Sequence, residues 1–251
     1  MNYKIVLFFL LLLLNISCKK ELSPVFISVS LSEEYKGNCN SEDCPKVTID
    51  YIIVKGDDLV SKKINSKIKD FIIASLFLEV EDKTNTNTIA SAADIFIKNY
   101  QTDKVEFPEL STYFAEISVS ESYSSSDLLC YETALYIFTG GAHGYGSISF
   151  LNIDPKIGEI IKNKDLFINE KEFIAYAEIK FREEMEIPED KPINSTGFWF
   201  ENNTFYLPES IGFTKENVIL LYNQYEIASY SSGPVELEIS LEKVLPYLKI
   251  K

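Results

Sequence analysis

The sequence predicts an α+β fold made of two small domains, the second with a mainly antiparallel sheet. Three observations favour this class. Aromatic residues are abundant, with 17 Phe and 15 Tyr among 251 residues, and such side chains are typical of strands. Segments with alternating apolar residues dominate the second half of the chain. Strands and helices do not alternate strictly, which argues against a parallel α/β sheet.

The first 17 residues are typical of an export signal. A short basic start is followed by ten apolar residues, 5–14, a run too short to span a membrane but suited to a secretory signal. Ser17 directly before Cys18 resembles the bacterial lipoprotein processing site, in which the cysteine becomes residue one and carries acyl chains. Asn15 departs from that pattern, which usually has an aliphatic residue there. An ordinary cleaved signal with an incidental Cys18 is the alternative.

We therefore expect Cys18 to attach the protein to a membrane, with residues 18–24 as a tether. Two or more acyl chains hold a protein stably without a transmembrane helix. Lys19 follows the cysteine where an Asp would signal retention, and by analogy with lipoprotein sorting this favours the outer membrane, on its periplasmic or surface face. The globular part is expected to work in the cell envelope, outside the cytoplasm.

The first domain is predicted over residues 25–105. Alternating apolar residues at 25–31 and 47–54 predict two strands. Between them, Cys39 and Cys44 lie in a turn-rich stretch and are expected to form a disulfide, which suits an oxidising compartment and would stabilise the fold by about 2 kcal/mol.

Two helices complete this domain. Asp57 and Asp58 are N-cap candidates for an amphipathic helix that runs to Leu76, and a second helix is marked by apolar residues from Ile89 to Tyr100. The stretch 101–110, which contains Pro108, sets the predicted boundary between the domains.

The second domain is predicted over residues 106–251 and is richer in strands. The run 128–139 is apolar on both faces, and Cys130 within it is expected to be a buried small hydrophobe. The predicted elements are strands at 113–119, 128–139 and 147–153, a helix over 173–184, short strands around Phe198 and Phe205, strands at 218–222 and 235–240, and a closing helical turn.

Charge and histidine content exclude several functions. The net charge of −14 disfavours nucleic acid as a partner, because the phosphate backbone attracts basic surfaces. A single histidine excludes sites that need two imidazoles, such as the HExxH zinc proteases. We expect no metal site, no cofactor and no catalytic residues.

A glycine-rich segment, 140–146, follows the long predicted strand and contains four glycines, which suits a turn with positive φ. It lacks the Lys-Ser/Thr of a phosphate loop, and the chain has no Gly-x-Ser-x-Gly nucleophile elbow. His143 in this turn could act as a lone general base. The favoured interpretation is that its ring ties the turn to a neighbouring backbone group or tyrosine.

A tyrosine-rich segment, Tyr222 to Pro234, lies between two predicted strands. It contains Tyr222, Tyr225 and Tyr230 together with Glu226 and a Gly233-Pro234 turn. Tyrosines offer a large contact area with a polar tip, which suits a binding surface. Equally, this could be a corner motif whose hydroxyls and Glu226 satisfy loop backbone groups.

Together these segments resemble a paired-domain bacterial extracytoplasmic module. It forms the outer portion of the lysozyme-sensing anti-sigma-V factor and precedes the catalytic domain of certain peptidoglycan deacetylases. Gly140 to His143 match its turn, Asp165 to Phe167 match an Asp-Leu-Phe before a helix, and Tyr222 to Pro234 match its C-terminal motif except at Gln224, where proline is usual. The resemblance implies an α+β fold whose second domain is similar to a subdomain of the Hsp70-type ATPase. The candidate ligand-binding residues are Gly140, Gly141, Ala142, His143, Tyr222, Tyr225, Glu226, Tyr230, Gly233 and Pro234.

The leading functional hypothesis is a non-catalytic, lipid-anchored binding module that recognises a lysozyme-type hydrolase or peptidoglycan. Its acidic charge would steer a cationic lysozyme electrostatically. One alternative is an enzyme that acts on peptidoglycan through a pair of carboxylates. Another is a structural partner in a larger surface complex.

Overall fold

The computed structural model describes residues 26–38, 44–77 and 86–250. The predicted signal peptide (1–17), the lipid-bearing Cys18 and the tether (18–24) lie outside these residues and stay predictions. Cys44 is disulfide-bonded. Its expected partner Cys39 also lies outside the described residues, so the pairing itself stays a prediction.

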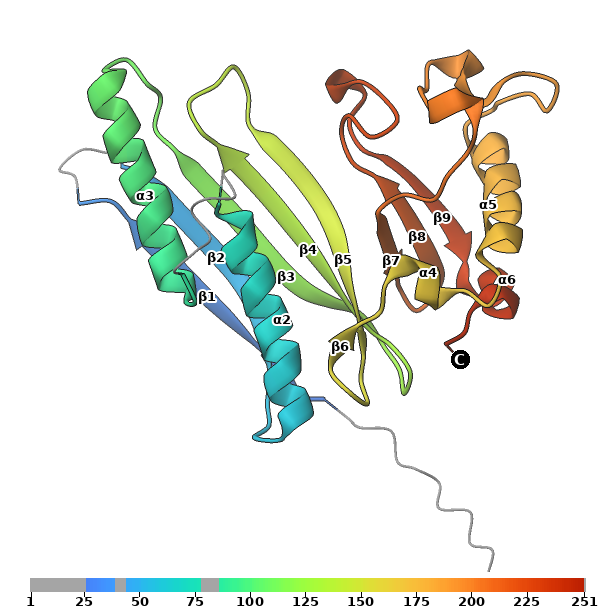
Figure 1. Cartoon of the computed structure of the whole chain (residues 1–251), viewed down its shortest axis with the longest axis horizontal. Helices are drawn as coiled ribbons and strands as arrows, with labels where there is room; N and C mark the ends of the chain where they lie inside the picture. Colours follow the sequence, from blue (N-terminus) through green and yellow to red (C-terminus); the bar gives the residue numbers. More distant parts are fainter. Residues whose placement is uncertain (1–25, 39–43, 78–85, 251) are drawn as a thin grey trace, which may run out of the picture.

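The fold is α+β, as expected, and its first sheet has six strands. The strands lie in sequence order: β1 (Ser28–Lys36), β2 (Lys46–Val54), β3 (Phe114–Ser124), β4 (Leu129–Phe138), β5 (Tyr145–Asp154) and β6 (Glu159–Ile160). Every neighbouring pair is antiparallel except β2 and β3, which are parallel. The crossover between those two strands carries α2 (Leu59–Ser75) and α3 (Ile89–Glu106), which lie on the same side of the sheet (Figure 1).

Both predicted helices are confirmed, and each begins at a polar cap. The Asp58 carboxylate accepts hydrogen bonds from the backbone N–H groups of Val60 and Ser61, both at 2.9 Å, and starts α2. Thr88 caps α3 in the same way. The second helix continues to Glu106, beyond the Tyr100 at which its apolar pattern ends. Its last turns carry no buried side chain, so the hydrophobic period could not detect them.

The predicted domain boundary at residues 105/106 falls in the last turn of α3, so it separates β2 from β3 within the first sheet. Val47 of β2, before the boundary, is the register partner of Ala115 of β3, after it. The first hydrophobic core likewise contains residues from both sides, such as Ile49 and Ile117. The Pro108 stretch is the turn that ends a parallel crossover, and the two sheets separate only after β6.

A separate antiparallel sheet consists of β7 (Ser210–Phe213), β8 (Asn217–Tyr222) and β9 (Val235–Ser240). Three helices accompany it: α4 (Asn163–Leu166), α5 (Glu170–Glu184) and α6 (Leu241–Val244). The strands expected around Phe198 and Phe205 are wrong. These residues lie in a loop with 3₁₀ turns, where their rings pack on Phe181 of α5 at centroid distances of 5.1 and 5.5 Å.

The chain around β4 contributes to both hydrophobic cores. Leu129 and Tyr131 are buried in the first core, whereas Leu128 and Cys130 are buried in the second. This confirms the expectation that Cys130 is buried and that the run is apolar on both faces. The two sheets therefore share a packing layer at the lower end of β4 and β5 in Figure 1. No helix within the described residues is both long and apolar enough to cross a membrane.

Candidate functional site

The two motif segments identified in the sequence meet at one end of the molecule. The β4–β5 turn, 139–144, and the β8–β9 loop, 223–234, both lie toward the top of Figure 1. The His143 ring stacks on Tyr230 with a centroid distance of 4.0 Å and an interplanar angle of 25°. The Tyr230 hydroxyl donates to the backbone oxygen of Gly144 at 2.8 Å. This arrangement agrees with the interpretation in which His143 ties the turn to a tyrosine.

Two glycines make this turn possible. Gly140 has a φ of +78°, and a Cβ there would lie 2.3 Å from Cδ1 of Leu110. A Cβ on Gly144 would lie 2.5 Å from the Tyr136 ring. By contrast, Gly141 and Ala142 are exposed at the tip of the turn and meet no such constraint.

Asn223 joins the second sheet to the edge of the first. Its side-chain oxygen accepts from the Ile148 N–H at 2.9 Å, and its side-chain nitrogen donates to the Ile148 carbonyl at 2.8 Å. These are the two backbone groups that a neighbouring strand would bind at this edge of β5. The Ser210 hydroxyl also donates to the Ile148 carbonyl, at 3.1 Å. Asn223 therefore takes the place of a strand partner, a role that was not assigned to it from the sequence.

Tyr222 and Glu226 hold the loop from within. Tyr222 is fully buried, and its hydroxyl donates to the Tyr206 carbonyl at 2.6 Å; burial raises the pKa of Tyr222. The Glu226 carboxylate accepts from the N–H groups of Asn223 at 3.0 Å and Glu209 at 3.2 Å. Partial burial raises the pKa of Glu226 despite these two hydrogen bonds, which lower it. Both side chains therefore bind backbone groups of the loop, as the interpretation of this segment as a corner motif predicts.

Tyr225 projects from the same loop into solvent. Its side chain is 55% exposed, its backbone adopts a φ of +70°, and its ring lies 5.5 Å from that of Tyr230. His143, Tyr230 and Tyr225 thus form a continuous row of rings. Gly233 has a φ of +72° with open space around it, so its backbone conformation rather than crowding favours glycine. Pro234 is exposed where the loop returns to β9.

Next to this row lies a groove that encloses about 750 Å³. Its described lining contains three tyrosines and two glutamates but no lysine, arginine or histidine. The lining residues are Tyr145, Ser147, Ser149, Tyr206, Leu207, Glu209, Ser210, Asn223, Gln224, Tyr225 and Glu226. The sequence does not predict that side chains of β5 and of residues 206–210 line this groove. The alternation at Ser147 and Ser149 was the available signal, because it places both on one face of a predicted strand.

The groove offers aromatic faces, hydroxyl groups and negative charge. Such a surface suits a partner that presents basic or hydroxyl-bearing groups, because tyrosine contributes both apolar contact and a polar tip. Within the described residues, no group of three or more His, Cys, Asp or Glu side chains is placed to hold a metal ion.

Comparisons with known proteins agree with this two-sheet organisation. Residues 38–145 match the family described as deacetylase PdaC, and residues 160–242 match the DUF3298 family, a protein family of unknown function. Similar solved structures include a DUF3298-family protein from Bacteroides fragilis, with a TM-score of 0.70 and 20% identity, covering 90% of this chain and 94% of that one. Another is a DUF3298-family protein from Pseudomonas aeruginosa, with a TM-score of 0.64 and 20% identity, covering 90% and 96%. At this identity, the likeness shows the fold alone. No curated protein matches the chain.

Proposed function

We propose that the chain, whose residues 38–145 and 160–242 match the PdaC and DUF3298 families, is a lipid-anchored, non-catalytic binding module of the cell envelope. Cys18 would carry the lipid and residues 18–24 would form the tether. The groove between the two sheets would bind the ligand. The β4–β5 turn and the β8–β9 loop would hold that groove in shape through the His143–Tyr230 contact.

The proposed ligand is a cationic extracellular protein, with a lysozyme-type hydrolase as the concrete candidate. One observation carries this proposal: the groove combines Tyr145, Tyr206 and Tyr225 with Glu209 and Glu226, and has no basic side chain in its described lining. Tyrosine is enriched at the centres of protein interfaces. The chain's net charge of −14 would also accelerate encounter with a basic partner at low ionic strength.

Isothermal titration of the purified full-length protein with lysozyme tests this ligand. Tyr225→Ala removes an exposed ring from the groove and should weaken binding about tenfold, the effect of losing a moderate interface hot spot. Phe107→Ala is the matched control, because Phe107 is also exposed, at 57%, but does not line the groove. The absence of binding at low ionic strength, or equal effects of the two variants, would rule out this ligand at this site.

Peptidoglycan is the second candidate ligand. The exposed rings of Tyr145 and Tyr225 favour it, because the flat apolar faces of sugar rings stack on aromatic side chains. Soluble wall fragments in the same titration distinguish the two ligands. Tyr225→Ala should weaken whichever of them binds in the groove.

The proposal that the module is non-catalytic also needs a direct assay. A raised carboxyl pKa is common at catalytic sites, so Glu226 is the candidate acid for the enzyme alternative. Its two backbone hydrogen bonds support a structural role instead. We expect no release of sugars from purified cell wall. Turnover that disappears in Glu226→Gln or His143→Ala would establish an enzyme.

A further inference from the structure

The described chain begins at the opposite end of the molecule from the groove. The blue segment that leads into β1 lies at the lower end of the fold in Figure 1. The backbone oxygen of Ile27 in this segment accepts from the N–H of Lys55, just before α2, at 2.8 Å. Cys18 is eight residues before Phe26 in the sequence. Eight residues span at most about 28 Å. A lipid on Cys18 would therefore hold this end within about 28 Å of the membrane.

Several segments meet at this end, which we call the basal pole: residues 26–27, 55–67, 125–128, 154–165 and Lys249. The β5–β6 turn packs directly on α2, since a Cβ on Gly158 would lie 3.0 Å from the Val60 carbonyl oxygen. Glu159 forms ion pairs with Lys63 at 2.7 Å and Lys67 at 3.0 Å.

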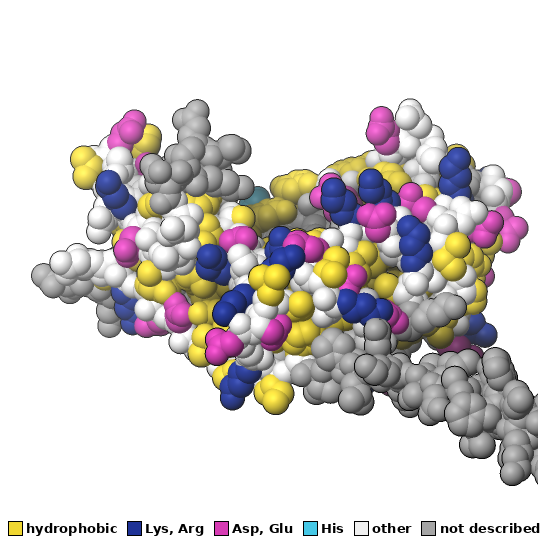
Figure 2. All heavy atoms as spheres, turned by 60° about the horizontal axis from the view of Figure 1, so that its bottom comes forward, with side chains coloured by type: hydrophobic (Ala, Val, Ile, Leu, Met, Phe, Trp, Pro, Cys, Tyr) yellow, Lys and Arg dark blue, Asp and Glu magenta, His cyan; other side chains and the backbone are white. Residues whose placement is uncertain are grey.

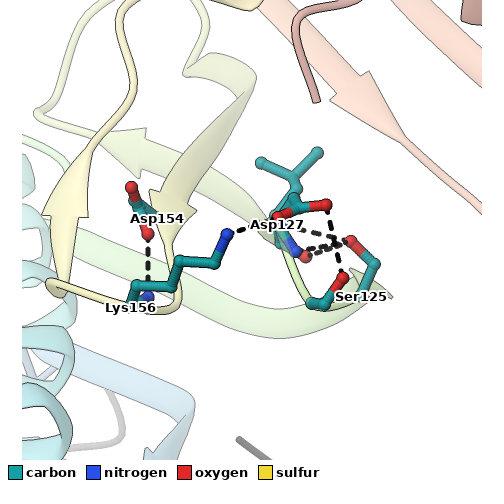
Figure 3. Close-up of polar contacts among 6 residues, drawn as sticks. Ser125, Asp127, Asp154 and Lys156 are labelled. Atoms are coloured by element: carbon teal, nitrogen blue, oxygen red, sulfur yellow. Dashed lines mark hydrogen bonds and ion pairs between the residues drawn. The ribbon is translucent and has the colours of Figure 1, made fainter. Parts of the chain in front are cut away.

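The β3–β4 loop joins the same surface through the contacts shown in Figure 3. The Lys156 ammonium pairs with Asp127 at 2.7 Å, and the Lys156 backbone N–H donates to Asp154 at 2.8 Å. Ser125 accepts hydrogen bonds from the backbone N–H groups of Asp127 and Leu128 and so fixes the loop. The basal pole is therefore one continuous surface and not a set of independent loops.

Large apolar side chains are exposed across the basal pole. Leu59 is 71% exposed, Ile27 62%, Ile157 52% and Ile160 48%. Figure 2, which brings this end forward, shows basic side chains lying among hydrophobic and acidic ones. This mixture of aliphatic and lysine side chains suits the boundary between headgroups and acyl chains, where apolar groups insert and ammonium groups remain at the surface.

The charge distribution distinguishes the basal pole from the rest of the chain. Its segments contain eight lysines and six acidic residues, whereas the remainder contains 16 basic and 32 acidic residues. A negatively charged lipid surface repels the acidic remainder and attracts the pole. The molecule therefore has a preferred orientation next to such a surface.

We propose that the basal pole docks on the anionic lipid surface that holds the acylated Cys18, so that the groove faces away from the membrane. This inference rests on the lipid anchor of the proposed function and adds a second, non-covalent contact. Each lysine close to an anionic surface changes the docked-to-detached ratio about fivefold. Reversing the charge of two pole lysines should lower that ratio by about 25-fold or more.

The test uses the full-length lipidated protein in vesicles of phosphatidylglycerol and phosphatidylcholine that carry a nitroxide-labelled lipid as quencher. A fluorophore is attached at Ile157→Cys on the basal pole or at Ala142→Cys on the exposed tip of the β4–β5 turn. Quenching is expected at position 157 and not at position 142. Adding Lys55→Glu and Lys62→Glu should abolish quenching at 157. Adding Lys98→Glu and Lys191→Glu, which make the same change of charge at exposed sites outside the pole, should leave it intact.

Each outcome separates the docking from the anchor. Equal quenching at the two labels, or no difference between the two charge-reversed pairs, would overturn the docking of the pole even though the protein stays with the vesicles. Retention of Cys18→Ser by vesicles of phosphatidylcholine alone, which offer the basal pole no anionic surface, to the same extent as the lipidated protein would instead overturn the lipid anchor.

Discussion

Asn223→Asp should destabilise the protein through a single contact at the edge of β5. The substitution preserves the shape of the side chain but replaces the nitrogen that donates to the Ile148 carbonyl at 2.8 Å with an oxygen. One net hydrogen bond is lost, at about 1 kcal/mol, and a partly buried carboxylate then faces a carbonyl oxygen, at about 1 kcal/mol more. The carbonyl itself keeps a donor, because Ser210 also binds it at 3.1 Å. The expected loss in the free energy of unfolding is therefore about 2 kcal/mol at pH 7.

Urea denaturation measures this loss, with Asn87→Asp as the matched control. Asn87 is exposed just before α3, so the same chemical change there should alter stability by less than about 0.5 kcal/mol. Asn223→Asp should also weaken ligand binding, because Asn223 lines the groove. If the two variants unfold at the same urea concentration, Asn223 does not serve as a strand partner for β5.

The other two predictions concern the turn and the buried acid. Gly144→Ala would place a Cβ 2.5 Å from the Tyr136 ring and should lower the free energy of unfolding by about 1–3 kcal/mol. In the control variant Gly141→Ala, the new Cβ meets only a carbonyl oxygen at 3.8 Å. Thermal unfolding compares the two variants, and equal melting temperatures would contradict the packing argument. Burial raises the pKa of Glu226 in the folded state above the ordinary range of a glutamate, so the stability that the protonated carboxyl group contributes at low pH is lost as the pH rises through the folded pKa. Gln has no titrating group, so the stability of Glu226→Gln relative to the parent should increase as the pH rises from the ordinary glutamate pKa of about 4.3 through the raised pKa of Glu226. A difference independent of pH would show that burial does not perturb this carboxyl group.

The sequence predicted the elements whose apolar residues follow a clear period. The helix that begins after Asp58 carries buried residues at helical spacing, and the alternation around Ile117 marks a strand. β7 was missed because it has only four residues, all buried, and contains Gly212, which is typical of a turn. A Cβ on Gly212 would lie 2.4 Å from the Phe150 ring, so this glycine reflects contact with β5, a distant segment. The glycine at position 212 is therefore explained by tertiary packing and not by a turn.

In the candidate site, too, local sequence patterns predicted the segments but not the contacts between them. Glycine content and tyrosine spacing indicated the two segments, but not that His143 would stack on Tyr230, 87 residues later in the chain. The sequence predicts short strands around Phe198 and Phe205, since aromatic side chains favour sheets. Their rings instead surround Phe181, where mutual packing of aromatic side chains decides the backbone path.

The position of β5 constrains how such a protein could have arisen. The two family matches end at residue 145 and resume at residue 160, so almost all of β5 falls between them. Yet Ile153 of this strand is buried in the first core, and Phe150 packs against the second. Genetic recombination that exchanged either half without this strand would leave one core open to water. The two halves are therefore expected to be inherited together, as a single evolutionary unit.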